Sequence, residues 1–225
     1  MVYGVLKSLR ILLPVIALLS LFSCSMEKKL ARKFVRNDST RTVLVIPPYY
    51  LYKTSLKDFE VKNAEELSDW ELDSVLYENS IFLKYIWDSI FIENYYNSYC
   101  DGLKELGYTV YPEDSLQGFL QGKPNAYIFN LAQLELEEYI MPVVEKEEFE
   151  DYLYYQVFNL NAINVNSWLE ISSMNEEGSN ELFFSSLFLT DELEGYFRYN
   201  YFTGDVKYYY ELDSLNLDMV YELGG

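Results

Sequence analysis

The chain contains no histidine, and this absence removes several classes of enzyme at once. Histidine is the usual general base near neutral pH, the partner of catalytic serine and cysteine, and the commonest metal ligand. Serine–histidine catalysis, cysteine–histidine catalysis and histidine metal sites are therefore excluded. We expect no catalytic residues, no metal site and no cofactor, and we predict that the protein is not an enzyme.

Two further patterns resemble enzyme motifs only in part. The glycine-containing segment Gly118–Lys123 is one residue too short for a phosphate-binding loop, and Pro124 stands where a magnesium-binding hydroxyl belongs. The two acids of a glycoside hydrolase could come from Glu135, Glu137 and Glu138, or from the acidic run Glu145, Glu147, Glu148, Glu150 and Asp151. An acidic run is more often a solvated face of the protein. A carboxylate-dependent glycoside hydrolase is therefore the third of our hypotheses.

Cysteine is scarce, with only Cys24 and Cys100 in the chain. Cys100 falls inside an expected helix, where a cysteine behaves as a small buried apolar residue. If Cys24 is modified, Cys100 has no partner for an internal disulfide. A disulfide framework is therefore not expected, and the core has to stabilise the domain.

Basic residues are scarce in most of the chain. From Val43 onward there are nine Lys and Arg against 34 Asp and Glu, a net charge of −25. A body this acidic repels phosphate backbones, so nucleic acid is not expected as a partner. Residues 25–42 differ, with six basic side chains against two acidic ones. They lack apolar periodicity and predict a flexible basic tether, attracted to an anionic membrane surface by about 1 kcal/mol per basic residue.

A hydrophobic run long enough to span a membrane is also missing. The longest apolar stretch, Ile11–Phe22, has 12 residues, against about 20 needed to cross a bilayer. Lys7 and Arg10 precede it, and the small residue Ser23 follows it. This order predicts a secretory signal peptide. A permanent membrane anchor is the less favoured alternative.

The end of this stretch, Leu21-Phe22-Ser23-Cys24, resembles the lipobox of bacterial lipoproteins. The resemblance implies cleavage before Cys24, which then carries the lipid that holds the protein on the membrane. It divides the chain into a signal peptide (1–23), a lipidated cysteine with a basic tether (24–42) and a single domain (43–225). Ser25 follows the cysteine, and by resemblance to lipoprotein sorting this implies the outer membrane. Some lipoproteins carry an acidic cluster near the cysteine as a surface-export signal, whereas here Lys28 and Lys29 follow a single Glu27, which implies the periplasmic side.

The domain itself is rich in apolar and aromatic residues. Its first half predicts alternating strands and helices, namely a strand at Thr42–Ile46, a short helix at 67–76, a helix at 88–106, a strand at 108–111, a short helix at 114–121 and a long strand at 125–138. The second half predicts a meander of about five antiparallel strands, including 182–189 and a hairpin of 196–201 with 206–210. The fold class is α+β: a β-α-β-α-β half continues into the meander, and helices layer the sheet.

The first half resembles a group of envelope lipoproteins that includes the curli-secretion lipoprotein and the lipoprotein activators of penicillin-binding proteins. The shared features are the strand Val43–Ile46 before two prolines, the strand start Leu106-Gly107-Tyr108-Thr109-Val110, and the long strand beginning at Ala126. The resemblance covers residues 43–138. It implies a shared fold and a non-enzymatic role.

The predicted hairpin of 196–210 holds the best candidate binding residues. Strand alternation places Phe197, Tyr199 and Tyr201 on one face, which we expect to be core. The other face carries Tyr196, Arg198 and Asn200, and tyrosine with arginine is typical of binding sites. A tyrosine-rich core on both faces is the alternative. We name Tyr196, Arg198 and Tyr208 as candidate partner-binding residues.

Together these observations predict a lipid-anchored envelope protein that acts by binding, as an assembly or scaffold component. Its expected partners are the membrane, through the N-terminal lipid, and an envelope protein. The alternative is a glycan-binding lipoprotein that uses the tyrosine-rich hairpin. Both hypotheses place the activity on the same hairpin.

Overall fold

The computed structural model describes residues 42–121, 126–149, 151–174 and 180–224. The predicted signal peptide, Cys24 and nearly all of the tether lie outside the described residues. The chain divides into two units, residues 1–41 and 42–225, and every described residue belongs to the second. None of the helices in the described ranges is long and apolar enough to cross a membrane.

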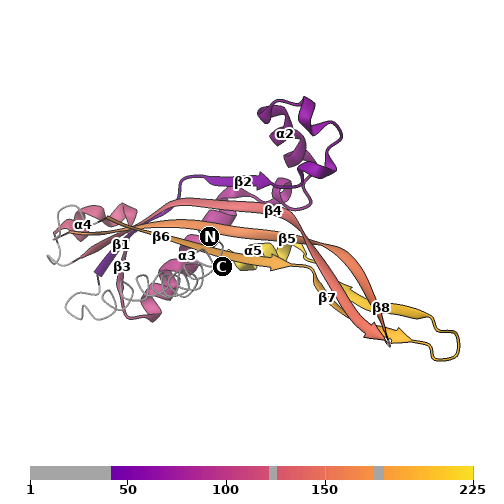
Figure 1. Ribbon diagram of the computed structural model, residues 1–225. Helices are drawn as coiled ribbons and strands as arrows, with labels where there is room; N and C mark the ends of the chain where they lie inside the picture. Colours follow the sequence, from indigo (N-terminus) through magenta and orange to yellow (C-terminus); the bar gives the residue numbers. More distant parts are fainter. Residues whose placement is uncertain (1–41, 122–125, 150, 175–179, 225) are drawn as a thin grey trace, which may run out of the picture. The chain divides into compact units, whose positions relative to one another are not determined.

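A six-stranded mixed sheet forms the centre of the domain (Figure 1). Its strands run in the order β3-β1-β4-β5-β6, and β2 pairs with β4 beside β1. β1, β2 and β3 are parallel to their neighbours, whereas β4, β5 and β6 pair antiparallel. The bounds are β1 (Thr42–Ile46), β2 (Leu51–Ser55), β3 (Thr109–Pro112), β4 (Tyr127–Phe149), β5 (Tyr152–Ser173) and β6 (Asn180–Thr190).

A bulge in β4 lets two short strands share one edge of this long strand. The β4–β5 register shifts between Leu131 and Gln133, so Ala132 is left unpaired. β1 docks on β4 before the bulge and β2 docks after it. The extra residue reverses the alternation of side chains. Buried Phe129 and Leu131 are therefore followed by buried Leu134.

Helices cover the face of the sheet that carries Leu134 and Leu136. They are α2 (Asp69–Asn79), α3 (Asp88–Glu105) and α5 (Leu217–Leu223). The short α4 (Leu116–Leu120) packs instead through Phe119 against Leu44 and Ala126, in a separate cluster. Short 3-10 turns lie at Asp58–Glu60, Ala64–Glu66, Leu83–Tyr85 and Glu113–Ser115. Phe91 of α3 and Val220 of α5 are completely buried in the same cluster as Leu134. This face holds the main core of the domain.

The termini of the helices follow the local sequence. Ser68 and Glu71 form a capping box at the start of α2. The hydrogen bonds from Ser68 to the Glu71 carboxylate lower the pKa of that group. Gly107 follows α3 with φ 85°, a left-handed conformation that glycine adopts without strain. Cys100 is buried inside α3, as expected, and burial raises the pKa of its thiol.

Beyond the six-stranded sheet, β4 and β5 continue as a two-stranded ribbon. Pairing of β5 with β6 ends at Ala162 and Thr190, but β4 and β5 stay paired as far as Phe149 and Tyr152. A second sheet, the hairpin of β7 (Glu192–Tyr199) and β8 (Val206–Asp213), lies along this ribbon (Figure 1). We call Val143–Phe149, Tyr152–Asn159 and Glu192–Asp213 the arm, and the rest of residues 42–224 the body.

The α+β fold class is confirmed, but the finer order is not. β2 follows β1 directly, so the expected β-α-β-α-β order does not hold. The meander contains three strands, and the last two strands form a separate sheet. β4 also runs eleven residues past the predicted end at Glu138. The predicted turn at 122–124 lies outside the described residues.

Candidate binding site on the arm

The hairpin of β7 and β8 has an inner face that packs against the β4–β5 ribbon. The Phe158 ring lies 5.4 Å from the Tyr208 ring and 4.9 Å from the Tyr210 ring, measured between centroids. Farther along the ribbon, Phe149 stacks on Tyr199 at 5.5 Å. These contacts are all aromatic, and they fix which face of the hairpin looks toward the ribbon.

Tyr208 lies at the centre of this inner face. Its ring also packs edge to face against Phe197, 4.7 Å away across the hairpin. A Cβ on Gly195 would come within 2.3 Å of the Tyr208 hydroxyl oxygen, so only glycine leaves room for this ring. Desolvation, together with the negative charge of Glu145, raises the pKa of Tyr208. Tyr208 is therefore a packing residue of the arm.

The outer face of the hairpin carries a pair of exposed tyrosines. Tyr196 and Tyr209 lie opposite each other in the β7–β8 register, and their rings stack at 5.8 Å with an interplanar angle of 21°. Tyr196 is 61% exposed and Tyr209 is 44% exposed. The two rings stiffen each other and form a flat aromatic surface toward solvent.

Like charges face each other on both sides of this tyrosine pair. Toward the loop, Arg198 lies opposite Lys207. Toward the body, two acidic pairs follow: Glu194 with Glu211, and Glu192 with Asp213. Like charges directly opposite in a sheet destabilise the pairing by a few tenths of a kcal/mol to about 1 kcal/mol. The outer face therefore bears an electrostatic cost that packing within the chain does not explain.

The basic pair borders a hollow at the loop end of the hairpin. The hollow measures about 460 Å³ and is lined by Arg198, Tyr199, Asn200, Tyr201, Phe202, Asp205, Lys207 and Tyr209. The turn that shapes it is held by Asn200, whose backbone N–H donates to the Asp205 carbonyl and whose carbonyl accepts from Gly204. Gly204 has φ 74°, which favours glycine here. Cations and rings thus meet around one small hollow.

The structure brings together two of the three predicted binding residues. Tyr196 and Arg198 both lie on the outer face, whereas Tyr208 points to the inner face. Lys207 and Tyr209 complete the outer face, and sequence reasoning did not name them. The hairpin register could have identified them, because it pairs each with a residue already chosen. We call Tyr196, Arg198, Lys207 and Tyr209 the hairpin site.

The expected core face of the hairpin is only partly buried. Phe197 and Tyr199 are half-buried: the Phe197 ring packs against Tyr208 across the hairpin, and the Tyr199 ring stacks on Phe149 of the ribbon. Tyr201 lies past the end of β7 and is 84% exposed, with its ring edge against Tyr199. The prediction of a full aromatic core is therefore wrong for Tyr201. A two-stranded hairpin on a two-stranded ribbon is too narrow to exclude water from that position.

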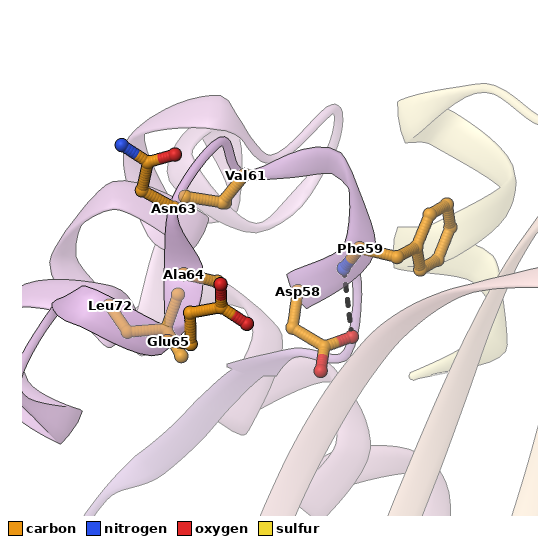
Figure 2. A pocket seen from close by; sticks show the side chains of 7 residues that line it. All are labelled: Asp58, Phe59, Val61, Asn63, Ala64, Glu65 and Leu72. Atoms are coloured by element: carbon orange, nitrogen blue, oxygen red, sulfur yellow. Dashed lines mark hydrogen bonds between the residues drawn. The ribbon is translucent and has the colours of Figure 1, made fainter.

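A second hollow lies in the body, around the turns between β2 and α2 (Figure 2). It also measures about 460 Å³ and is lined by Asp58, Phe59, Val61, Asn63, Ala64, Glu65 and Leu72. The Asp58 carboxylate accepts a hydrogen bond from the Phe59 backbone N–H at 2.9 Å. The polar residues that line it, Asp58, Asn63 and Glu65, are all exposed. It offers no chemistry comparable to the hairpin site.

The structure separates Glu138 from the other candidate hydrolase carboxylates of β4. Glu138 is completely buried. Its carboxylate accepts a hydrogen bond from Lys57 Nζ at 2.8 Å and further hydrogen bonds from the backbone N–H groups of Ile81 and Phe82. Glu137 lies on the opposite face of β4, where it accepts from the Asn166 side chain. Glu138 is therefore a structural residue, and it cannot act together with Glu137 on one substrate.

Comparison with known proteins adds no assignment. The chain matches no family model, no curated protein and no solved structure. In the ranges that the structure describes, no group of three Cys, Asp or Glu side chains is placed to hold a metal ion.

Proposed function

We propose that the protein is a lipid-anchored envelope protein that acts by binding a partner protein, without catalysis, through the hairpin site. The observation that carries the proposal is the Arg198–Lys207 pair beside the exposed Tyr196–Tyr209 stack. Exposed tyrosine next to arginine is the composition of an interface hot spot. A partner that covers this face buries the two tyrosine rings and places its own charged groups beside Arg198 and Lys207.

The charge of the site indicates which partner it prefers. Three body lysines are engaged by carboxylates, in the pairs Lys53–Asp88, Lys57–Glu138 and Lys104–Asp101. Among the described residues, Arg198 and Lys207 form no ion pair. The carboxylates of an acidic partner segment would attract both cations and so offset the repulsion between them. The proposed partner is therefore an envelope protein with exposed carboxylates.

A glycan is the second candidate ligand. The hollow of about 460 Å³ falls in the size range of small-ligand sites, and aromatic rings and an amide line it. Rings can stack on the apolar face of a sugar, while Arg198, Asn200 and Asp205 offer hydrogen bonds. The same two cations would favour an acidic sugar over a neutral one.

The proposal includes the N-terminal lipid and the position in the cell. Cys24 carries the lipid and the basic tether joins it to the domain, on the periplasmic face of the outer membrane. The resemblance of residues 43–138 to the curli-secretion and penicillin-binding-protein-activator lipoproteins supports a role in assembly. If this is correct, Cys24→Ala moves the protein out of the membrane fraction. A Cys24→Ala protein that stays processed and membrane-bound contradicts it.

A photo-cross-linking side chain at Asn200 of the full chain in cells tests the binding surface. We expect an adduct with a partner protein that falls at least several-fold in Arg198→Ala and Lys207→Ala. Lys146→Ala is the matched control, because Lys146 is an exposed arm lysine outside the hairpin site. An adduct that is equally strong in all three variants contradicts the assignment.

The glycan alternative is tested on the purified full chain. An acidic glycan is favoured if immobilised polygalacturonate retains the protein and immobilised dextran does not. Arg198→Ala should then abolish the retention on polygalacturonate. If neither matrix retains the protein while the Asn200 adduct persists, the partner is a protein.

A further inference from the structure

One face of the six-stranded sheet stays open along β4, β5 and β6, on the side opposite α2, α3 and α5. Alternation and register place one set of side chains on it. We call these residues the open face: Glu135 and Glu137 of β4, Asn164, Asn166 and Trp168 of β5, and Phe184, Ser186 and Phe188 of β6. In the part of the chain that the structure describes, their hydrogen bonds and ring contacts stay within the sheet.

The open face carries exposed aromatic rings. Phe184 is 58% exposed and Phe188 is 61% exposed. Phe184 also packs on Trp168, with 5.0 Å between the ring centroids. A sheet face that meets only solvent is normally polar, and an exposed apolar patch usually marks an interaction surface. The rings therefore indicate that a binding partner covers this face.

Two amide side chains form the middle strip of the open face, along β5. Asn166 donates a hydrogen bond to Glu137 at 2.7 Å and accepts one from Ser186 at 2.7 Å. These neighbours bury it, so that it is only 6% exposed. Asn164 donates to the same Glu137 carboxylate at 3.4 Å. The strip is therefore held in place by the sheet itself, with carboxylates on its β4 side and phenylalanine rings on its β6 side.

The two carboxylates of the open face are not matched by cations of the domain. Among the described residues, Glu135 and Glu137 form no ion pair. Their hydrogen bonds come from neutral groups: Glu135 accepts from Thr54, and Glu137 accepts from the two amides. No residue of the open face is basic, and the chain from Val43 onward carries a net charge of −25. This surface therefore attracts cationic groups and repels anionic ones.

We propose that the open face binds an extended segment of a partner protein in which basic and apolar residues alternate. The segment lies along β5. In an extended chain, side chains on the same edge repeat every second residue, about 6.6 Å apart. Glu135 and Glu137 have the same spacing on β4, so two basic side chains of the segment meet both carboxylates. The apolar residues between them point to the other edge, where Phe184 and Phe188 lie.

Charge selects this occupant over the others. An anionic membrane surface, a nucleic acid or an acidic segment would meet only carboxylates on the open face. A second copy of the chain would place its own Glu135 and Glu137 against these two. A neutral glycan could stack on the rings, but it would leave both carboxylates without a cation. Only a segment that is both basic and apolar complements the two sides of the strip.

The open face is independent of the proposed function. It belongs to the body, whereas the hairpin site lies on the arm, and the two surfaces share no residue. Their charges are also opposite, because the hairpin site presents Arg198 and Lys207. One segment therefore does not suit both surfaces.

Two matched peptides test the proposal on the purified full chain. The probe is Lys-Val-Lys-Val-Lys-Val, and the control peptide Lys-Lys-Lys-Val-Val-Val has the same charge and composition without the alternation. Tryptophan fluorescence follows the titration, because Trp168 lies on the open face. Trp168→Phe should abolish the fluorescence change. Trp87→Phe, at the start of α3, should leave it intact.

The alternating peptide should bind more tightly than the control peptide. Glu135→Gln combined with Glu137→Gln should weaken its binding about five-fold, as expected for the loss of two exposed charge pairs. Glu147→Gln combined with Glu148→Gln is the matched control, because it removes the same charge from exposed residues of the arm.

The contribution of the rings is tested in the same titration. Phe188→Ala should weaken the binding of the alternating peptide. Leu187→Ala, an exposed residue on the other side of β6, should not. Thermal melting of each variant confirms that it is folded.

Several outcomes would overturn the proposal. Equal binding of the two peptides, or equal weakening in the two double variants, would show that the acidic body attracts cations without a defined site. A Trp168 response to cellohexaose and to neither peptide would show that the face binds a glycan. A photo-cross-linking side chain at Ser186 that reacts only with the chain itself would show that no partner is needed to cover the face. Because none of these results involves Arg198 or Lys207, failure here leaves the hairpin site untouched.

Discussion

The body and the arm are both built on β4 and β5, but they bury their side chains to different degrees. In the body, helices cover one face of the sheet, and residues such as Leu134, Leu136 and Ile163 are completely buried. In the arm, no described side chain of Val143–Phe149, Tyr152–Asn159 or Glu192–Asp213 is fully buried. Two narrow ribbons cannot exclude water as a helix layer does. Aromatic rings compensate, because each gives a large contact area even when half-buried.

The two regions also treat charge in opposite ways. The buried Lys57–Glu138 pair of the body is satisfied on all sides: Glu138 accepts from Ile81 and Phe82, and Lys57 also donates to Asn161. The exposed charges of the hairpin are instead arranged as like-charge pairs. The body uses its charges to hold its elements in register. The hairpin places like charges opposite each other on its exposed face.

A single buried carboxylate joins the two regions. Asp191 stands between β6 and β7 and accepts hydrogen bonds from the Asn161 and Leu215 backbone N–H groups, at 2.7 and 2.8 Å. It thereby fixes the start and the end of the hairpin segment on β5. This corner directs the hairpin onto the β4–β5 ribbon.

The largest expected effect is in the body. Glu138→Ala leaves the Lys57 charge buried without a partner and removes the acceptor for the turn at residues 81–83. Breaking a buried pair in this way costs about 3–5 kcal/mol of unfolding free energy, measured by urea denaturation. Glu137→Ala, next to it but on the opposite face, should cost about 1 kcal/mol or less. Equal losses of unfolding free energy in Glu138→Ala and Glu137→Ala would mean that the body does not depend on the Lys57–Glu138 pair.

An intermediate effect is expected at the centre of the arm. Phe158→Ala removes the ring that contacts Tyr208 and Tyr210, at a cost of roughly 2 kcal/mol, less than for a fully buried phenylalanine. Hydrogen exchange should become faster in residues 192–213, while β1 keeps its protection. Tyr155→Ala, on the exposed face of the same strand, is the control and should change neither the unfolding free energy nor the hydrogen exchange of residues 192–213. Faster exchange throughout the body would show that arm and body unfold as one unit.

The smallest effect concerns the charges of the hairpin site. Arg198→Glu places a carboxylate opposite Lys207 and should stabilise the hairpin by about 0.2–1 kcal/mol. Hydrogen exchange of β7 and β8 should slow at low salt, and the gain should shrink at about 1 M salt. Arg198→Gln removes the repulsion without adding attraction and should give a smaller gain. Destabilisation by Arg198→Glu would mean that the basic pair supports the hairpin itself.

Several elements could be predicted from local sequence because their signals are local. α3 follows from apolar residues at helical spacing and from Gly107 at its end, and β1 follows from a β-branched run before two prolines. The ends of the long strands could not be predicted in this way. The sequence presents Glu145–Glu148 only as part of a solvated acidic run, yet these residues continue β4, because the pairing partner Leu153–Gln156 supplies their strand geometry.

β2 and the buried pair escaped prediction for the same reason. Leu51–Ser55 is short and partly polar, and it becomes a strand by pairing with β4. Glu138 resembled one more acid in an acidic run, and its partner Lys57 lies 81 residues earlier in the chain. Two residues this far apart in the sequence become neighbours only in the folded structure. The register of β2 on β4 is what brings the two charges together.

For the hairpin, the sequence by itself determined which side chains share a face, because side chains alternate along every strand. It placed Tyr196 with Arg198 and separated both from Phe197. It did not determine which face would be open, and Tyr208 was therefore named for binding although it packs inward. Only the tertiary structure decided this, since the face that becomes buried is the one that meets Phe158 and Phe149 on the ribbon. Alternation is a local property of the chain, whereas burial depends on what packs against it.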